Sequence, residues 1–305
     1  MDGIKGLFQA MCLMLAAWLL LGGCAYESGD SSDSGGTGTL VLSLSDAPVN
    51  ADNIAGVWIT ITGIEYKLNN KWTSLEGDFD GGPHNLLQLT GGNSSLLGQL
   101  TLEAGDYKNI RFQLDAPDEG ESAPANPGSY IEFSDGSANA ALFVPSGAQT
   151  GYKALGDFSV PANGTVDLTA DFDARKAVVE AGSKFILKPT IRLIVTDEAG
   201  AISGAVTNLG ANGVVVHAYE ADTYAASEET AGSNDNAFPN AVSSSNLVQT
   251  EGGTYTVAFL SAAFAYDLVI AEYDADGTAT VLGSLSGITV TSGATTTADI
   301  DLSAL

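Results

Sequence analysis

The chain is nearly without cysteine. Its 305 residues include two, Cys12 and Cys24, and both fall within the first 24 positions. The remaining sequence therefore offers no disulfide, no thiolate ligand for a metal and no cysteine nucleophile. A fold built from residues 25–305 has to be held together by burial alone, and its length permits a core of sufficient size.

Positive charge is scarce as well. Eleven Lys and Arg stand against 37 Asp and Glu, so the formal net charge is −26, and residues 197–305 contain no Lys or Arg. Such a surface repels phosphate backbones, and we therefore expect no nucleic-acid partner. The same acidity suits solubility in a salty medium and also attracts divalent cations.

The amino terminus resembles a bacterial lipoprotein signal. Lys5 precedes an apolar run that ends at Leu21-Gly22-Gly23-Cys24, and this tetrapeptide is similar to the lipobox, which has Leu and two small residues before an invariant Cys. We expect a signal peptide at 1–23 and acyl chains on Cys24 that anchor the protein in a membrane. An uncleaved anchor helix is the alternative.

The residues after Cys24 indicate which membrane holds the anchor. Ala25 and Tyr26 are not the acidic pair that resembles an inner-membrane retention signal, so an outer-membrane lipoprotein is expected, facing the periplasm or the exterior. Residues 24–37 are rich in Ser, Gly and Asp, which predicts a flexible linker.

Beyond the linker, apolar residues recur at every second position. Ile110, Phe112 and Leu114 alternate with polar residues, as in a strand with one face on a core. Near Gly63 the alternation changes phase, which predicts a β-bulge. These patterns predict an all-β fold made of antiparallel sheets packed as sandwiches.

Two such regions follow one another along the chain. A polar turn near 197–200 separates them, so we predict two β-sandwich domains in tandem, at 38–196 and 197–305. Residues 221–253 are rich in Ser, Asn and Ala without periodicity, and they form either a mobile loop or a binding loop.

Groups suited to catalysis are few. The two histidines, His84 and His217, lie in different predicted domains. Asp167, Asp171 and Asp173 alternate along one strand at a separation that overlaps the carboxylate spacing of inverting glycosidases. A row along one strand lacks a second wall, however, so we predict a solvent-exposed row balanced by nearby Arg and Lys, and no catalytic residue.

Two Asp-Gly turns are candidate calcium sites. Asp78 and Asp80 precede one glycine turn, and Asp274 and Asp276 precede the other. Neither continues into a complete calcium loop with a distant Glu, and Asp-Gly is also an ordinary hairpin turn. Calcium is therefore the single candidate cofactor.

The first predicted domain resembles a known family. Six segments occur in order: Leu44–Pro48, Asn85–Leu89, Ala104–Tyr107, Val144–Lys153, Asp171–Lys176 and Leu187–Arg192. Together they are similar to the bacterial lipoprotein domain-of-unknown-function family 4382, over roughly 38–195. The resemblance implies a β-sandwich and a cell-envelope location, and it brings no established activity.

The second predicted domain resembles a transthyretin-like, carboxypeptidase-regulatory-like sandwich. The segments that carry this resemblance are Ile202–Val206, Val214–Tyr219, Gly252–Tyr255 and Gly287–Val290. Domains of that kind usually serve as stalks or accessory modules, so the resemblance implies a non-catalytic role.

One loop of the first domain carries candidate ligand-binding residues. Between Pro145 and Lys153, two glycines free the backbone, and Ser146, Gln149, Tyr152 and Lys153 offer an aromatic ring and hydrogen-bonding groups. These groups could dock a sugar or a peptide, and a purely structural crossover between strands is the alternative.

Together these features predict a protein that is not an enzyme. We predict a cell-envelope lipoprotein that acts as a binding or adhesion module for a polysaccharide or a protein. A structural spacer or accessory subunit of an envelope assembly is the alternative, and calcium-dependent binding and glycoside hydrolysis are weaker ones.

Overall fold

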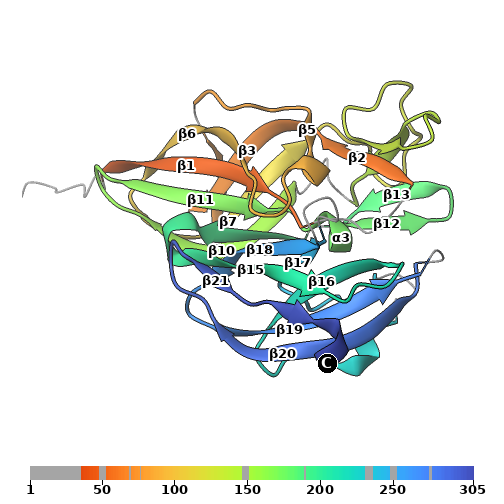
Figure 1. Cartoon of the computed structure of the whole chain (residues 1–305). Coiled ribbons are helices and arrows are strands. Elements are labelled where there is room, and N and C mark those ends of the chain that lie inside the picture. The colour runs from red at the N-terminus through yellow and green to blue at the C-terminus, as the bar shows by residue number, and fades with distance from the viewer. Residues whose placement is uncertain are drawn as a thin grey trace, which may run out of the picture. The chain divides into compact units, whose positions relative to one another are not determined.

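The structure, a computed structural model, describes the chain from residue 36 to residue 305. Within that span it leaves out residues 48–52, 69, 76, 146–150, 189, 231–235, 248–252 and 275–276. Residues 36–305 belong to one compact unit. The described residues are nearly all β, apart from α3 (Ala174–Ala177) and the 3-10 turns Leu86–Gln88, Thr196–Glu198, Ala226–Glu228 and Leu302–Ala304 (Figure 1).

The largest sheet has eight strands in the order β4-β3-β7-β10-β14-β11-β1-β6. They are β1 (Thr37–Ser45), β3 (Ile61–Leu68), β4 (Lys71–Ser74), β6 (Ser95–Glu103), β7 (Gly105–Leu114), β10 (Tyr152–Val160), β11 (Thr165–Asp171) and β14 (Ile191–Val195). Strand β14, late in the sequence, thus lies between β10 and β11 in the middle of the sheet.

A second sheet has six strands in the order β12-β13-β9-β8-β2-β5. They are β2 (Ile54–Ile59), β5 (His84–Asn85), β8 (Tyr130–Phe133), β9 (Ala140–Phe143), β12 (Val178–Ala181) and β13 (Lys184–Leu187). Apolar residues of both sheets, such as Leu42, Ile110 and Ile131, form one buried cluster. The sandwich-type all-β fold predicted from the sequence is confirmed.

The remaining strands form two four-stranded sheets. One is β18-β15-β21, with β22 also paired to β15, and the other is β17-β16-β19-β20. Their bounds are β15 (Ala199–Thr207), β16 (Gly213–Glu220), β17 (Ser243–Asn246), β18 (Thr254–Ser261), β19 (Ala265–Tyr273), β20 (Ala279–Thr289), β21 (Thr295–Thr297) and β22 (Ile300–Asp301). They have buried clusters of their own, one of which contains Ile202, Val216 and Leu268. The predicted boundary at 196/197 falls between the two sets of strands, and the division into two domains stays a prediction.

The period-two alternation places the strands correctly. Ile110 and Phe112 are fully buried, while Arg111 between them is partly exposed. The irregularity at Gly63 is also confirmed, because the pairing of β3 with β7 shifts register between Ile61 and Gly63. Alternation reflects which face of a strand meets the core, so it survives in the structure wherever one face is buried.

The direction of neighbouring strands differs from the prediction. Most pairs are antiparallel, but β1 runs parallel to β11 (Figure 1), and β10–β14, β13–β9 and β15–β21 are parallel as well. The sheets are therefore mixed. Alternation of side chains is the same in both kinds of pair, so the sequence pattern carries no information on direction.

The aperiodic stretch at 221–253 is not simply a loop. Within its described part, Phe238 and Ala241 are fully buried, and β17 pairs with β16. Ser243, Ser244 and Ser245 make up most of this strand and are all buried, so it lacks the polar–apolar alternation that reveals a strand.

Candidate functional site

The structure describes only some of the candidate ligand-binding residues of the predicted loop. Ser146 and Gln149 lie outside the described residues, and Lys153 on β10 is exposed. Tyr152 is buried, its ring stacks on that of Phe172 with centroids 5.6 Å apart, and its hydroxyl donates to the Lys188 carbonyl. Tyr152 therefore contributes to the core, and this position does not fit the predicted role of an accessible stacking ring.

Two of the candidate calcium ligands bond to the backbone of their own turns. Asp80 is exposed, and its carboxylate accepts from the Gly82 backbone N–H at 3.0 Å, while Asp274 accepts from the Thr278 N–H at 2.8 Å. Asp78 is exposed, and Asp276 lies outside the described residues. Across the described ranges, no three His, Cys, Asp or Glu side chains gather as metal ligands would.

A cluster of buried carboxylates lies where β1, β11 and α3 meet. Asp46, Asp171 and Asp173 are at most 5% exposed. Phe172 donates its backbone N–H to the Ser45 carbonyl at 3.0 Å, which brings the end of β1 beside the end of β11. The prediction of a solvent-exposed row is therefore wrong for Asp171 and Asp173, because other parts of the chain cover them.

Cations face two of the three carboxylates. Arg192 donates to one oxygen of Asp171 through two nitrogens, at 2.6 and 2.9 Å. The Lys176 ammonium lies 2.9 Å from Asp173, and the Arg175 guanidinium lies 3.6 Å from it. Because the carboxylates are held in these ion pairs, they do not face each other across an open cleft as a glycosidase requires.

Asp46 is held differently. One of its carboxylate oxygens accepts from the Ala174 backbone N–H at 2.6 Å, and the other has no hydrogen-bond partner among the described residues. Burial, and then the charges of Asp171 and Asp173, raise the pKa of Asp46 well above its usual value. Burial also raises the pKa of Asp171, although Arg192 opposes that change.

Arg175 connects this cluster to the C-terminal sheets. Its guanidinium donates to the carbonyl oxygens of Ala237 and Phe238, both at 3.0 Å, and to the Ser244 hydroxyl at 3.2 Å. The side chain is 5% exposed. A buried guanidinium with this many acceptors fixes the relative position of the segments that supply them.

Arg192 makes a second connection, to β18. Besides its ion pair with Asp171, it donates to the Phe259 carbonyl at 3.1 Å. Phe259 has a φ of 55°, in the left-handed region that a residue with a bulky side chain rarely adopts. It sits in a β-bulge, because Gly200 pairs with Leu260 and Ile202 pairs with Val257, which leaves Ala258 and Phe259 opposite a single residue of β15.

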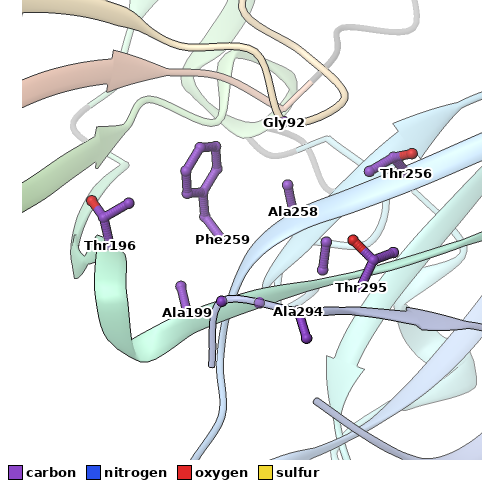
Figure 2. A pocket seen from close by; sticks show the side chains of 11 residues that line it. Gly92, Thr196, Ala199, Thr256, Ala258, Phe259, Ala294 and Thr295 are labelled. Atoms are coloured by element: carbon purple, nitrogen blue, oxygen red, sulfur yellow. The ribbon is translucent and has the colours of Figure 1, made fainter. Parts of the chain in front are cut away.

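The bulge forms one wall of a groove of about 320 Å³. Figure 2 shows the Phe259 ring between Thr196 and Ala258, with Gly92 above them and Ala199, Ala294 and Thr295 below. The lining residues are Gly92, Thr196, Ala199, Gly200, Ala201, Thr256, Ala258, Phe259, Gly293, Ala294 and Thr295. None carries a charge, so the groove suits an uncharged ligand group with an apolar face for the ring and polar atoms for the threonines.

No sequence pattern pointed to Phe259. It lies in an apolar run, and nothing in that run distinguishes it from its neighbours. Arg192, by contrast, belongs to one of the six segments that carry the family resemblance, and so do Asp46, Asp171, Asp173 and Arg175. The structure brings residues of three of these segments together in one buried cluster of charged side chains.

Residues 37–189, half of the chain, match the family model "Domain of unknown function (DUF4382)". The chain therefore belongs to this family. The match ends two residues before β14, and it does not extend to the C-terminal sheets, for which the transthyretin-like resemblance stays a prediction. No curated protein matches the chain.

Solved structures give distant likenesses. A candidate cell adhesion protein from Bacteroides ovatus has 13% identity and a TM-score of 0.19, with 86% of this chain and 91% of that one covered. A candidate adhesin from the same organism has 10% identity and a TM-score of 0.18, covering 81% and 76%. The major pilin T-13 of Streptococcus pyogenes has 10% identity and a TM-score of 0.17, covering 87% and 99%. Scores this low do not define a shared fold, so these proteins indicate nothing about a ligand.

Proposed function

We propose that this chain is a non-enzymatic binding or adhesion module of the bacterial cell envelope, and that a polysaccharide or protein ligand contacts it in the groove beside Phe259. The observation that carries the proposal is the Phe259 bulge. A bulky residue in the left-handed region costs on the order of 1–3 kcal/mol, and such residues cluster at binding sites. Arg192 and Asp171 hold the backbone there.

The arrangement of the charges supports binding rather than catalysis. Asp171 is engaged by Arg192 and Asp173 by Arg175 and Lys176, and the groove itself is uncharged. General acid–base chemistry needs a titratable group within hydrogen-bond reach of the reacting atoms. The groove supplies an aromatic ring, threonine side chains and backbone groups, which are suited to holding a sugar ring or a peptide side chain.

The proposed location rests on the lipobox-like segment at Leu21–Cys24, which lies outside the described residues. Within the described part of the chain, no helix is long and apolar enough to cross a membrane. Cys24→Ser is expected to abolish labelling of the protein by radioactive palmitate in growing cells and to release it from the membrane fraction. Labelling that persists in this variant would contradict lipidation at Cys24.

The proposed function is tested with the full-length protein in mild detergent on a glycan array, with Ca²⁺ present and then chelated. We expect a saturable hit, and we expect Phe259→Ala to weaken it by about tenfold or more, as for other central aromatic contacts. Phe264→Ala is the matched control, because Phe264 is an exposed phenylalanine nearby that does not line the groove.

The outcomes are distinct. Equal binding by Phe259→Ala and the native protein would overturn the groove as the site. Loss of binding on chelation would place Ca²⁺ in the interaction. A blank array, followed by capture of a fixed envelope protein that Phe259→Ala fails to capture, would identify a protein ligand.

A structural role is the second candidate, and the Arg175 connection favours it. A spacer or accessory subunit has to keep its parts in a fixed arrangement, which buried hydrogen bonds from one guanidinium to three residues of the C-terminal region achieve. Co-purification with a fixed partner, unaffected by Phe259→Ala, would favour this role over ligand binding in the groove.

A further inference from the structure

Three of the chain's few cations lie on one face of the eight-stranded sheet. Lys153 on β10 is directly opposite Arg111 on β7, and Arg111 is directly opposite Glu65 on β3. Directly paired residues project from the same face of a sheet, and so do residues two positions apart on one strand. Lys67 on β3 therefore shares this face with Glu65.

Apolar side chains are interleaved with these cations. Trp72 on β4 is directly opposite Lys67, and Leu155 follows Lys153 by two positions on β10. The Arg111 guanidinium lies 4.4 Å from the centre of the Trp72 ring, and the Lys67 ammonium lies 5.9 Å from it. We refer to Lys67, Trp72, Arg111, Lys153 and Leu155 as the cationic face.

This face is open to solvent. Lys153 is exposed, Leu155 is 60% exposed, and Lys67, Trp72 and Arg111 are partly exposed. The residues between them on the same strands, such as Tyr66, Phe112 and Ala154, point into the core and are buried. An exposed leucine beside a lysine adds nothing to that core.

Within the part of the chain that the structure describes, only some of the cations on this face have an acidic partner. Like charges directly opposite each other on neighbouring strands destabilise a sheet, and Arg111 and Lys153 are such a pair. Glu65 compensates Arg111 from the other side, through an ion pair. Among the described residues, no ion pair involves Lys67 or Lys153, in a chain where acidic residues outnumber basic ones by 37 to 11.

We propose that the cationic face binds an acidic polysaccharide, whose carboxylates lie against Lys67, Arg111 and Lys153 and whose sugar rings pack against Trp72 and Leu155. A polymer with a carboxylate on each sugar unit can reach cations on successive strands, which lie about 4.8 Å apart. Aromatic and aliphatic side chains between the cations suit the apolar faces of sugar rings, which a simple inorganic anion lacks. This site is separate from the Phe259 groove.

The test uses full-length protein in mild detergent, with polygalacturonate as the acidic probe and dextran as the neutral one. We expect polygalacturonate to bind, with an affinity that falls as salt rises, and dextran not to bind at this face. The double variant Lys67→Gln/Lys153→Gln is expected to weaken polygalacturonate binding by about tenfold, the effect of losing two exposed charge contacts.

The matched control is Lys71→Gln/Lys184→Gln, which removes the same charge elsewhere. Lys71 precedes Trp72 by one position and so projects from the other side of β4, and Lys184 lies on β13 of the six-stranded sheet. Phe259→Ala is expected to bind polygalacturonate as the native protein does. The experiments therefore distinguish a wrong proposal for the groove from a wrong proposal for the cationic face.

Two results would overturn the proposal. One is the absence of polygalacturonate binding by the native protein at low salt, or equal binding by the two double variants. The other is self-association of the native protein, abolished by Lys67→Gln/Lys153→Gln, without polygalacturonate binding. That result would make the acidic C-terminal region of a second copy the occupant of this face.

Discussion

The Arg175 guanidinium lies 3.0 Å from the carbonyl oxygen of Phe238, a residue 63 positions further along the chain. This hydrogen bond crosses from the region that matches the family model to the C-terminal region. The contact is reinforced from the other direction, because the Asn236 side chain donates to the Val178 carbonyl at 3.0 Å and also to the carbonyl of Arg175. Each of the two regions therefore donates hydrogen bonds to backbone carbonyls of the other.

Replacing Arg175 should be strongly destabilising. Arg175→Met keeps most of the side-chain volume but leaves buried carbonyl oxygens without donors and removes one cation from Asp173. We expect a loss of about 3–5 kcal/mol in the free energy of unfolding, measured by urea titration. Lys108→Met, at an exposed lysine, should change it by less than about 0.5 kcal/mol. A small effect of Arg175→Met would show that the connection is dispensable.

Asp46 should make the protein less stable as the pH rises. Burial raises the pKa of its carboxyl, so the folded state binds a proton that the unfolded state has already released. Its contribution is therefore fully present below the unfolded pKa of about 3.9, and it is lost as the pH rises through the folded pKa. Asp46→Asn keeps an acceptor for the Ala174 N–H and does not ionise. It should gain stability over the native protein at pH 7 and lose that advantage near pH 4, as followed by thermal unfolding.

His217 should have the opposite effect. Burial, and then the charges of Arg175 and Lys176, lower the pKa of His217 well below its usual value of about 6.5. The unfolded chain therefore binds more protons, and the stability contributed by the neutral ring is lost as the pH falls below 6.5. The ring stacks on Phe238 with centroids 4.2 Å apart. His217→Phe should retain this packing and reduce the loss of stability between pH 7 and pH 5. An unchanged pH profile would show that other groups dominate in that range.

A substitution of Tyr152 distinguishes a role of this residue in the core from a role in ligand binding at the surface. Tyr152→Phe removes the hydroxyl that donates to the Lys188 carbonyl and keeps the stacking on Phe172. We expect a loss of about 0.5–1.5 kcal/mol in unfolding free energy, because a part-buried hydrogen bond is lost, with no change in glycan binding. Reduced ligand affinity at unchanged stability would instead support the surface role expected from the sequence.

Local sequence patterns predicted where the strands lie better than they predicted which strands are neighbours in a sheet. The burial of alternate residues such as Ile110 and Phe112 follows from a preference that each strand has by itself. The order of strands in a sheet depends on contacts between distant segments, and alternation within one strand holds no information about those contacts. The parallel pairing of β1 with β11 could not be read from the sequence for this reason.

In the candidate sites too, local patterns predicted less where contacts between distant segments decide the burial of a side chain. Asp171 alternates with core residues and therefore points away from the core between the eight-stranded and six-stranded sheets, as expected of a polar residue. It is nevertheless buried, because its partner Arg192 contacts Phe259, which comes 67 positions after Arg192 in the sequence. Lys153 was expected in a binding loop, and the structure places it on β10 with its side chain exposed.

The central position of β14 has a consequence for biosynthesis. Without it, the eight-stranded sheet consists of two separate parts, β4-β3-β7-β10 and β11-β1-β6. Because β14 is the last of these strands to leave the ribosome, neither part can join the other until residue 195 has emerged. A chain truncated at residue 189, where the family match ends, would expose the unpaired edges of β10 and β11, and such edges are templates for aggregation.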